Sequence, residues 1–181
     1  MGYIEETGAA QLFRDVRIAA IYEGTNGIQE IDLVQRKLGL SGGAAVHREI
    51  ADMRAAAGAL RNSNAENFGE MEPCLAEAVD AFERATAYML NACKTRVEDA
   101  LAGATPYLRL FALARGGAAL ARGALAAHRF SRAGNSDKAL EARIATARFF
   151  AENIAAGAGG LERDVTRGAG SVQASAPVLG Q

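Results

Sequence analysis

Residues 72–97 read EPCLAEAVDAFERATAYMLNACKTRV, and this stretch decides the fold class of the chain. Its apolar side chains recur at alternating steps of four and three residues, which is the period of an amphipathic helix. The members of this stripe are Leu75, Val79, Phe82, Thr86, Met89, Cys93 and Val97. Pro73 suits the first turn of such a helix, because the amide hydrogen that proline lacks would have no intrahelical partner there.

Three other segments carry apolar stripes of comparable length, and short polar loops separate them. Their members are Val46, Ile50, Met53, Ala57 and Leu60; Leu110, Leu113, Gly117, Leu120, Ala124 and His128; and Leu140, Ile144, Ala147, Ala151 and Ile154. Thr105-Pro106 and Ser136 are the expected starts of the last two helices. No segment shows the period-two alternation of a half-buried strand. The pattern predicts an all-α fold with an up-down four-helix bundle over residues 44–167.

The composition also favours closely packed helices. Half of the 181 residues are apolar, 6% are aromatic and none is Trp, and Ala dominates the apolar share. Ala is the best helix former, whereas Gly116, Gly117 and Gly123 each cost roughly 1 kcal/mol relative to Ala inside a helix. We expect another helix to come close to the chain at these glycines.

The charges exclude some classes of partner. The 20 basic and 21 acidic residues are spread along the chain without a basic stripe, which argues against nucleic acid as a partner. We expect no membrane span and no signal peptide. Cys74 and Cys93 lack a C-x-x-C spacing, so neither a disulfide framework nor a metal site is expected. We therefore expect a cytoplasmic protein.

The first 43 residues have a different organisation. A helix that Thr7 can cap is followed by a loop, Glu23-Gly24-Thr25-Asn26-Gly27, and by a second helix. That helix carries Ile28, Ile31, Val34 and Leu38 on one stripe and ends at Gly39. We place the boundary with the bundle near Ser41-Gly42-Gly43. Residues 168–181 are rich in Gly, Ala and Ser and are expected to form a flexible tail.

Glu23 is the candidate for chemistry in this loop. The glycines at 24 and 27 let the backbone turn and approach a ligand closely. A carboxylate that is partly removed from water has a raised pKa, in the range useful for a general base. The spacing alone fits equally well a plain capping loop, in which Thr25 or Asn26 caps the second helix.

Three linked segments carry a resemblance to a known family. They are residues 2–6 (GYIEE), residues 14–18 (RDVRI) and residues 21–29 (IYEGTNGIQ). Their order and spacing resemble the C-terminal signature of the acyl-CoA dehydrogenases. Residues 44–181 are similar, more loosely, to the extra helical domain that follows this signature in larger bacterial members. The resemblance implies that residues 1–43 are the end of the catalytic helical domain.

The resemblance implies a reaction and a role for each loop residue. The family binds FAD and oxidises an acyl-CoA thioester to its trans-2-enoyl form. Glu23 stands where the family's base removes the α-proton, and the backbone N–H of this residue helps to polarise the thioester carbonyl. Tyr22 and Gly24 would contact the substrate, and Thr25, Asn26, Gly27 and Gln29 would contact the cofactor. Many relatives carry Gln or Glu where this chain has Gly27, so only the backbone can contribute there.

The resemblance also implies partners. They are an acyl-CoA substrate, an electron-transfer flavoprotein as acceptor, and further copies of the chain in a dimer or tetramer. The acyl group stays open between medium-chain, long-chain and methylmercaptopropionyl substrates. The family's flavin-covering domains do not precede Gly2, so we expect this chain alone to be inactive and free of flavin. The alternative is a non-catalytic helical module that mediates oligomerisation or covers a catalytic domain.

Overall fold

The computed structural model describes residues 4–21, 24–135 and 137–179, and within these ranges it contains helices and no strand. The predicted all-α class is therefore confirmed. The α-helices are α1 (Ala9–Arg17), α2 (Asn26–Asp32), α3 (Ala44–Ser63), α4 (Met71–Thr95), α5 (Val97–Ala102), α6 (Ala104–Arg132), α7 (Lys138–Phe149), α8 (Ala158–Arg167) and α9 (Ala169–Leu179). The 3-10 segments are η1 (Glu5–Thr7), η2 (Ile18–Ala20), η4 (Leu40–Gly43), η5 (Glu66–Phe68) and η7 (Ala155–Gly157), and the π-helical ones are η3 (Leu33–Lys37) and η6 (Phe150–Ile154).

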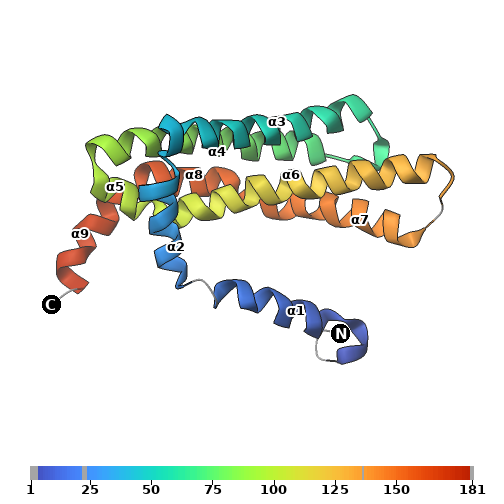
Figure 1. Ribbon diagram of the computed structural model, residues 1–181, viewed down its shortest axis with the longest axis horizontal. Helices are drawn as coiled ribbons and strands as arrows, with labels where there is room; N and C mark the ends of the chain where they lie inside the picture. The colour runs from blue at the N-terminus through green and yellow to red at the C-terminus, as the bar shows by residue number, and fades with distance from the viewer. Residues whose placement is uncertain (1–3, 22–23, 136, 180–181) are drawn as a thin grey trace.

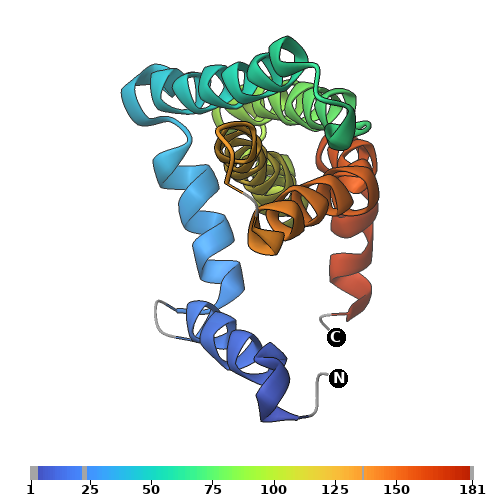
Figure 2. The same cartoon turned by 90° about the vertical axis from the view of Figure 1, so that its right-hand side faces the viewer.

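The long helices α3, α4 and α6 lie side by side with α7 and α8. Figures 1 and 2 show that α3 and α6 run in one direction, while α4 and the α7–α8 segment run in the other. The last antiparallel element is not one helix, because η6 and η7 interrupt it between α7 and α8. The short helices α5 and α9 were not predicted.

The apolar stripes form the core, as their spacing predicts. The buried side chains include Ile50, Met53, Leu60, Leu75, Val79, Phe82, Met89 and Leu110. Thr86 is the buried polar member, and its hydroxyl group lies 2.9 Å from the hydroxyl group of buried Tyr107. Val97 and Ile154 depart from their stripes and are exposed. At Val97 the backbone leaves the helical conformation at Arg96 and α5 takes a new direction, and Ile154 ends the π-helical segment η6.

The glycines of α6 meet neighbouring elements at two of the expected positions. A Cβ atom on Gly117 would lie 3.1 Å from Leu75 Cδ1, and one on Gly116 would lie 3.4 Å from Phe150 Cζ. A Cβ atom on Gly123 would have no atom within 4 Å. The close approach is thus made by side chains, and Gly123 does not take part in it.

Two predicted helix ends and the predicted tail differ from the structure. Gly8, with φ +74°, is the residue that directly precedes α1, and Thr7 lies one position earlier, where its Oγ1 accepts a hydrogen bond from the Ala9 N–H at 3.5 Å. Ser136 lies outside the described residues, and Asp137 caps α7 by accepting a hydrogen bond from the Ala139 N–H at 2.8 Å. The segment expected to be a flexible tail contains helix α9 over residues 169–179, which packs against α5. Its Gln173 Nε2 donates to Asp99 Oδ1 at 2.7 Å.

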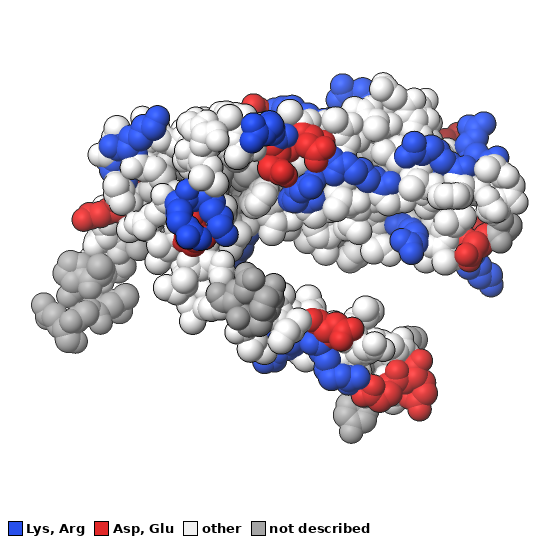
Figure 3. All heavy atoms as spheres, in the orientation of Figure 1, with Lys and Arg blue, Asp and Glu red and all other residues white. Residues whose placement is uncertain are grey.

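Judged by length and composition alone, helix α6 could cross a membrane. The core helix of a soluble protein meets the same two criteria. It packs against α3, α4, α7 and α8, and its buried side chains include Tyr107, Leu110 and Leu125. The expectation of no membrane span stays untested. On the face drawn in Figure 3, basic and acidic side chains are interspersed over the bundle.

An N-terminal arm, which we define as residues 4–21 and 24–43, leaves the bundle beside α6. The backbone turns between η3 and α3 at Ser41, Gly42 and Gly43, whose φ angles are +54°, +65° and +91°. Val34 and Leu38 are buried against the bundle, whereas Ile28 and Ile31, on the same predicted stripe, are exposed. Helix α1 lies apart from the bundle in both views (Figures 1 and 2) and has no buried residue.

Candidate functional site

The signature loop is described from Gly24 onward. Tyr22 and Glu23, the predicted substrate contact and the predicted base, lie outside the described residues. Gly24 has φ +106°, a conformation that L side chains rarely adopt. A Cβ atom added to Gly24 would meet only Gln29 Nε2 at 3.9 Å and Ile28 Cγ2 at 4.0 Å among the described atoms within 4 Å. Glycine is therefore required here by backbone conformation, and the space beside it is open.

Thr25 begins the second helix. Its backbone is extended, and its Oγ1 accepts a hydrogen bond from the Ile28 N–H at 3.4 Å. This is the capping interaction that the loop sequence allowed, and it occurs at Thr25 rather than Asn26. Capping does not exhaust the hydroxyl group, because its own O–H can still donate to a ligand. The cap and a cofactor contact are thus compatible at this residue.

Asn26 and Gly27 form the first turn of α2, and Gln29 follows one position after Ile28. The amides of a first helical turn have no intrahelical acceptor, and they point toward the side from which the chain enters. The helix also carries a partial positive charge at this end. The turn therefore supplies backbone donors suited to an anionic group, and Gly27 adds no side chain that would block approach.

Two hydrogen bonds attach the helix that carries the loop to the bundle, and ion pairs of Asp32 stabilise the helix itself. Thr105 Oγ1 donates a hydrogen bond to Glu30 Oε2, and Cys93 Sγ donates to the Val34 carbonyl oxygen at 3.6 Å. Asp32 pairs with Lys37 at 3.0 Å and with Arg36 at 2.6 Å, and both cations lower its pKa. Because α2 continues directly into η3, these contacts set the direction in which the loop projects.

Among the described residues, the charged side chains of the RDVRI segment form no ion pair with loop residues 24–29. Arg14 forms a bidentate ion pair with Glu5, with N···O distances of 2.8 and 2.9 Å. These hydrogen bonds from Arg14 lower the pKa of Glu5. Arg17 lies over the Phe13 ring, 5.8 Å from its centroid. No pair of Asp15 with either arginine is found in the described arm. The basic residues of α1 thus pair within the arm, away from residues 24–29.

A cavity at the C-terminal end of the α2–η3 helix was not predicted from the sequence. It has a volume of about 350 Å³, and Leu33, Lys37 and Leu38 of the arm line it together with bundle residues. The signal that could have revealed it was the grouping of Phe82, Tyr107 and Phe111 in a chain with 6% aromatic residues. In the part of the chain that the structure describes, no group of three His, Cys, Asp or Glu side chains could hold a metal ion.

Comparison with known proteins matches each of the two parts of the chain to a family of acyl-CoA dehydrogenase C-terminal domains. Residues 1–39 match the family described as acyl-CoA dehydrogenase, C-terminal domain, and residues 45–175 match the family described as acetyl-CoA dehydrogenase C-terminal like. The 3-methylmercaptopropionyl-CoA dehydrogenase of Ruegeria pomeroyi is 38% identical over 154 residues, which are 85% of this chain and 26% of that enzyme. The chain thus spans about a quarter of the length of this relative. It belongs to the acyl-CoA dehydrogenase family.

Proposed function

We propose that this chain is the C-terminal segment of an FAD-dependent enzyme that oxidises an acyl-CoA thioester to the trans-2-enoyl-CoA. The observation that carries the proposal is the loop after Glu23, in which Gly24 at φ +106° leads into a helix capped by Thr25. The open space beside Gly24 and the free amides of the first turn of α2 therefore follow the proposed base directly in the sequence. The matches to acyl-CoA dehydrogenase C-terminal domains support the reaction class.

The described loop residues fit a flavin dinucleotide. Its pyrophosphate is anionic, and the N-terminus of a helix favours phosphate through its free amides and its dipole. The amides of Asn26 and Gly27, the Thr25 hydroxyl group and the Gln29 side chain are the groups that would hold it. When bound, FAD supplies the acceptor for the hydride that leaves the β-carbon of the substrate.

The chain's own residues would handle the proton. Glu23 would remove the α-proton, and its backbone N–H would donate to the thioester carbonyl, where negative charge develops. Gly24 would lie against the thioester, since a side chain at this position would occupy the space beside it. Tyr22 would provide apolar cover for the substrate. An acyl-CoA is the proposed substrate class, and 3-methylmercaptopropionyl-CoA is the first to test because the Ruegeria pomeroyi relative is named for it.

The exposed apolar side chains of the arm support its place in a larger catalytic unit. Leu12, Phe13 and Val16 of α1 are 72%, 61% and 66% exposed, and Ile18 and Ile21 follow them at the surface. Apolar side chains gathered on one segment mark a surface that binds other protein. The rest of the catalytic unit is the proposed occupant of this surface.

The remaining expectations enter as proposals. We infer an electron-transfer flavoprotein as the acceptor and a dimer or tetramer as the assembly, both from the family resemblance. The free cysteines Cys74 and Cys93 support a reducing cytoplasm as the location. The alternative function, a non-catalytic module that mediates oligomerisation or covers a catalytic domain, is favoured by the exposed apolar face of α1, and it would leave Glu23 without a role.

A chimera separates the two functions. This chain replaces the matching C-terminal segment of the Ruegeria pomeroyi enzyme, and turnover of 3-methylmercaptopropionyl-CoA is measured with and without Glu23→Gln. Loss of a general base lowers the rate by about 10²–10⁴-fold. The Glu23→Gln chimera should therefore turn over substrate at least about 10²-fold more slowly while it retains flavin. Glu6→Gln changes an exposed carboxylate on the same arm and is the matched control.

Two outcomes would exclude Glu23 as the base. One is near-normal turnover of the Glu23→Gln chimera, and the other is an equal loss in the Glu6→Gln control. The chain by itself should purify without flavin absorbance, because it spans only about a quarter of its relative. Stoichiometric flavin absorbance in the isolated chain would contradict that expectation.

A further inference from the structure

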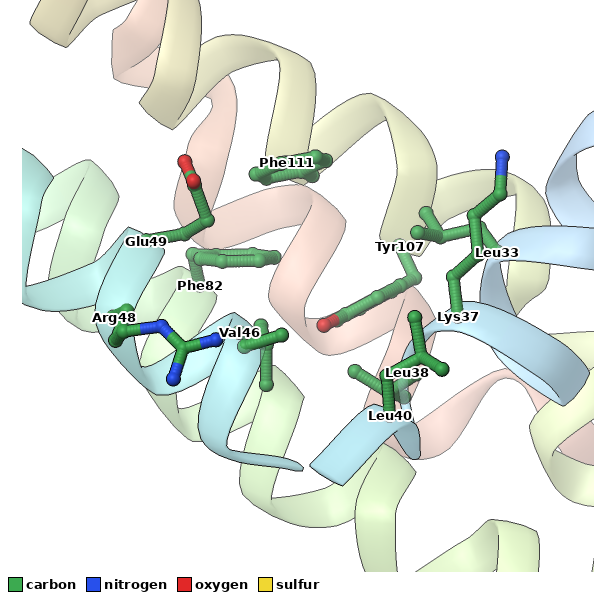
Figure 4. Close-up of a pocket in the computed structure, with 11 residues that line it drawn as sticks. Leu33, Lys37, Leu38, Leu40, Val46, Arg48, Glu49, Phe82, Tyr107 and Phe111 are labelled. Carbon is green, nitrogen blue, oxygen red and sulfur yellow. The ribbon is translucent and has the colours of Figure 1, made fainter. Parts of the chain in front are cut away.

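The cavity between the arm and the bundle is lined by apolar and aromatic side chains together with three charged ones, Lys37, Arg48 and Glu49. Its volume is about 350 Å³, within the range of roughly 300–1,000 Å³ typical of small-molecule sites. The lining comes from η3, η4, α3, α4 and α6, so residues distant in the sequence meet here. Figure 4 shows Leu33, Lys37, Leu38 and Leu40 on one side and Val46, Arg48 and Glu49 on the other.

Three aromatic rings form the inner wall of this cavity. Phe82 stacks on Tyr107 with 5.4 Å between the ring centroids and on Phe111 with 5.0 Å. The Tyr107 hydroxyl group pairs with the Thr86 hydroxyl group at 2.9 Å, and Tyr107 is buried, so this hydroxyl group offers no exposed polar surface to a ligand. This wall therefore suits an apolar chain rather than a polar group.

The charged residues at the mouth are Lys37, Arg48 and Glu49, and their ion pairs leave a net positive charge there. Glu49 is neutralised by Arg115 at 3.2 Å, and Lys37 shares Asp32 with Arg36. Within the described part of the chain, Arg48 forms no ion pair and no hydrogen bond. Its guanidinium group lies beside Val46 in Figure 4 and is exposed at the cavity edge. An anionic group at the mouth would thus find a cation that is not already paired.

The arm side of the cavity is built on the π-helical segment η3. A π-helix inside an α-helix is rare and occurs often at functional sites. Here it places Leu33 and Lys37 at the cavity, while the next residue, Leu38, is buried. Leu40, in the following turn, is 53% exposed at the rim and would lose this exposure to an apolar ligand.

We propose that this cavity binds a small amphipathic carboxylate with an unbranched apolar tail. The tail lies against Val46, Phe111 and Leu40, which are not fully buried, and the carboxylate pairs with Arg48 at the mouth. Such a ligand joins η3 to the bundle and so stabilises the attachment of the helix that carries the signature loop. This site is separate from the proposed dehydrogenase chemistry, because none of the described loop residues 24–29 lines it.

Octanoate is the probe, titrated into the 181-residue chain by calorimetry and followed by thermal unfolding. Binding is expected with a dissociation constant of about 1 mM or lower, the range open to a ligand of this size. Bound octanoate should raise the midpoint of unfolding, since a ligand specific for the folded state stabilises it. Octanol at equal concentration tests the carboxylate and should bind at least about tenfold more weakly, because it cannot form the charged hydrogen bond.

Variants locate the site. Arg48→Gln should weaken octanoate binding about tenfold, whereas Arg132→Gln, at the opposite end of the bundle, should leave it unchanged. Val46→Phe fills the cavity and should abolish binding; circular dichroism checks that each variant is folded. Three results would overturn the proposal: no octanoate binding to the wild type, equal binding of octanol and octanoate, or equal affinity in Arg48→Gln and wild type. Self-association that Val46→Phe abolishes, with no octanoate binding, would instead assign the cavity to a second copy of the chain.

Discussion

Gly69 closes the loop between η5 and α4 in a conformation that few other residues tolerate. Its φ is +52° and its ψ is −133°. A Cβ atom there would lie 2.4 Å from Arg148 Nε and 2.6 Å from Glu152 Oε1. Those two groups are themselves bonded at 2.7 Å, and Glu152 Oε1 also accepts a hydrogen bond from the Glu70 N–H at 3.0 Å. Gly69→Ala would therefore strain the backbone and displace the contact that joins this loop to α7 and η6.

The magnitude follows mainly from the backbone. A non-glycine residue in such a conformation costs about 1–3 kcal/mol. For a chain of this size each kcal/mol lowers the unfolding midpoint by roughly 2–4 °C, so Gly69→Ala should lower it by about 2–12 °C. Displacement of the Arg148–Glu152 pair adds to this loss. The assay is thermal unfolding followed by far-ultraviolet circular dichroism.

Gly123→Ala is the matched control for this variant. Gly123 lies within α6, and a Cβ atom there would have no atom within 4 Å. Replacement of an unstrained helical glycine by alanine stabilises by about 0.5–1 kcal/mol. The two alanine variants should therefore shift the midpoint in opposite directions. A Gly69→Ala protein as stable as wild type would refute the assignment of Gly69 as a strained close contact.

Two further predictions concern the core and the surface. Tyr107→Phe removes the partner of the buried Thr86 hydroxyl group and should lower the free energy of unfolding by about 1–2 kcal/mol. The double variant with Thr86→Val should recover part of this free energy. A larger loss in the double variant than in Tyr107→Phe would contradict the pairing. The Arg84 guanidinium lowers the pKa of Glu162 below its usual 4.5. Because the folded pKa is the lower one, the pair stabilises the fold above about pH 4.5 and this stability is lost as pH falls through the folded pKa. Stability measured from pH 5 to about pH 3 should fall less in Glu162→Gln than in wild type, and identical slopes would rule out this contribution.

The all-α class was predictable because the apolar stripes that indicate helices are local and periodic features of the sequence. Leu75, Val79, Phe82 and Met89 recur at helical spacing, and all of them are buried in the same core. Gly116 and Gly117 were marked as sites of close approach because glycine costs stability inside a helix. The partners, Phe150 and Leu75, could not be named, because they depend on how distant helices are aligned.

Features that depend on tertiary packing were not predictable in this way. The π-helical segments η3 and η6 continue α2 and α7 without a glycine or proline to mark them. Helix α9 lies in a segment whose composition is typical of a loose tail, and its contacts with α5 give it a place in the fold. In the signature loop, the sequence indicated a turn at Gly24 and a cap at Thr25 or Asn26. It did not decide between the two caps, since both residues have suitable side chains.

The stripe of the second helix shows why periodicity alone does not define a core. Ile28, Ile31, Val34 and Leu38 share one predicted face, yet the first two are 60% and 41% exposed and the last two are 2% and 3% exposed. The bundle covers only the end of the helix that passes beside α4 and α6. The exposed end begins at the capped loop, so whatever protein covers Ile28 and Ile31 also lies next to residues 24–27. The exposed side chains of Ile28 and Ile31 and the proposed catalytic loop are therefore contiguous, and a protein bound over these side chains would position the loop for its proposed reaction.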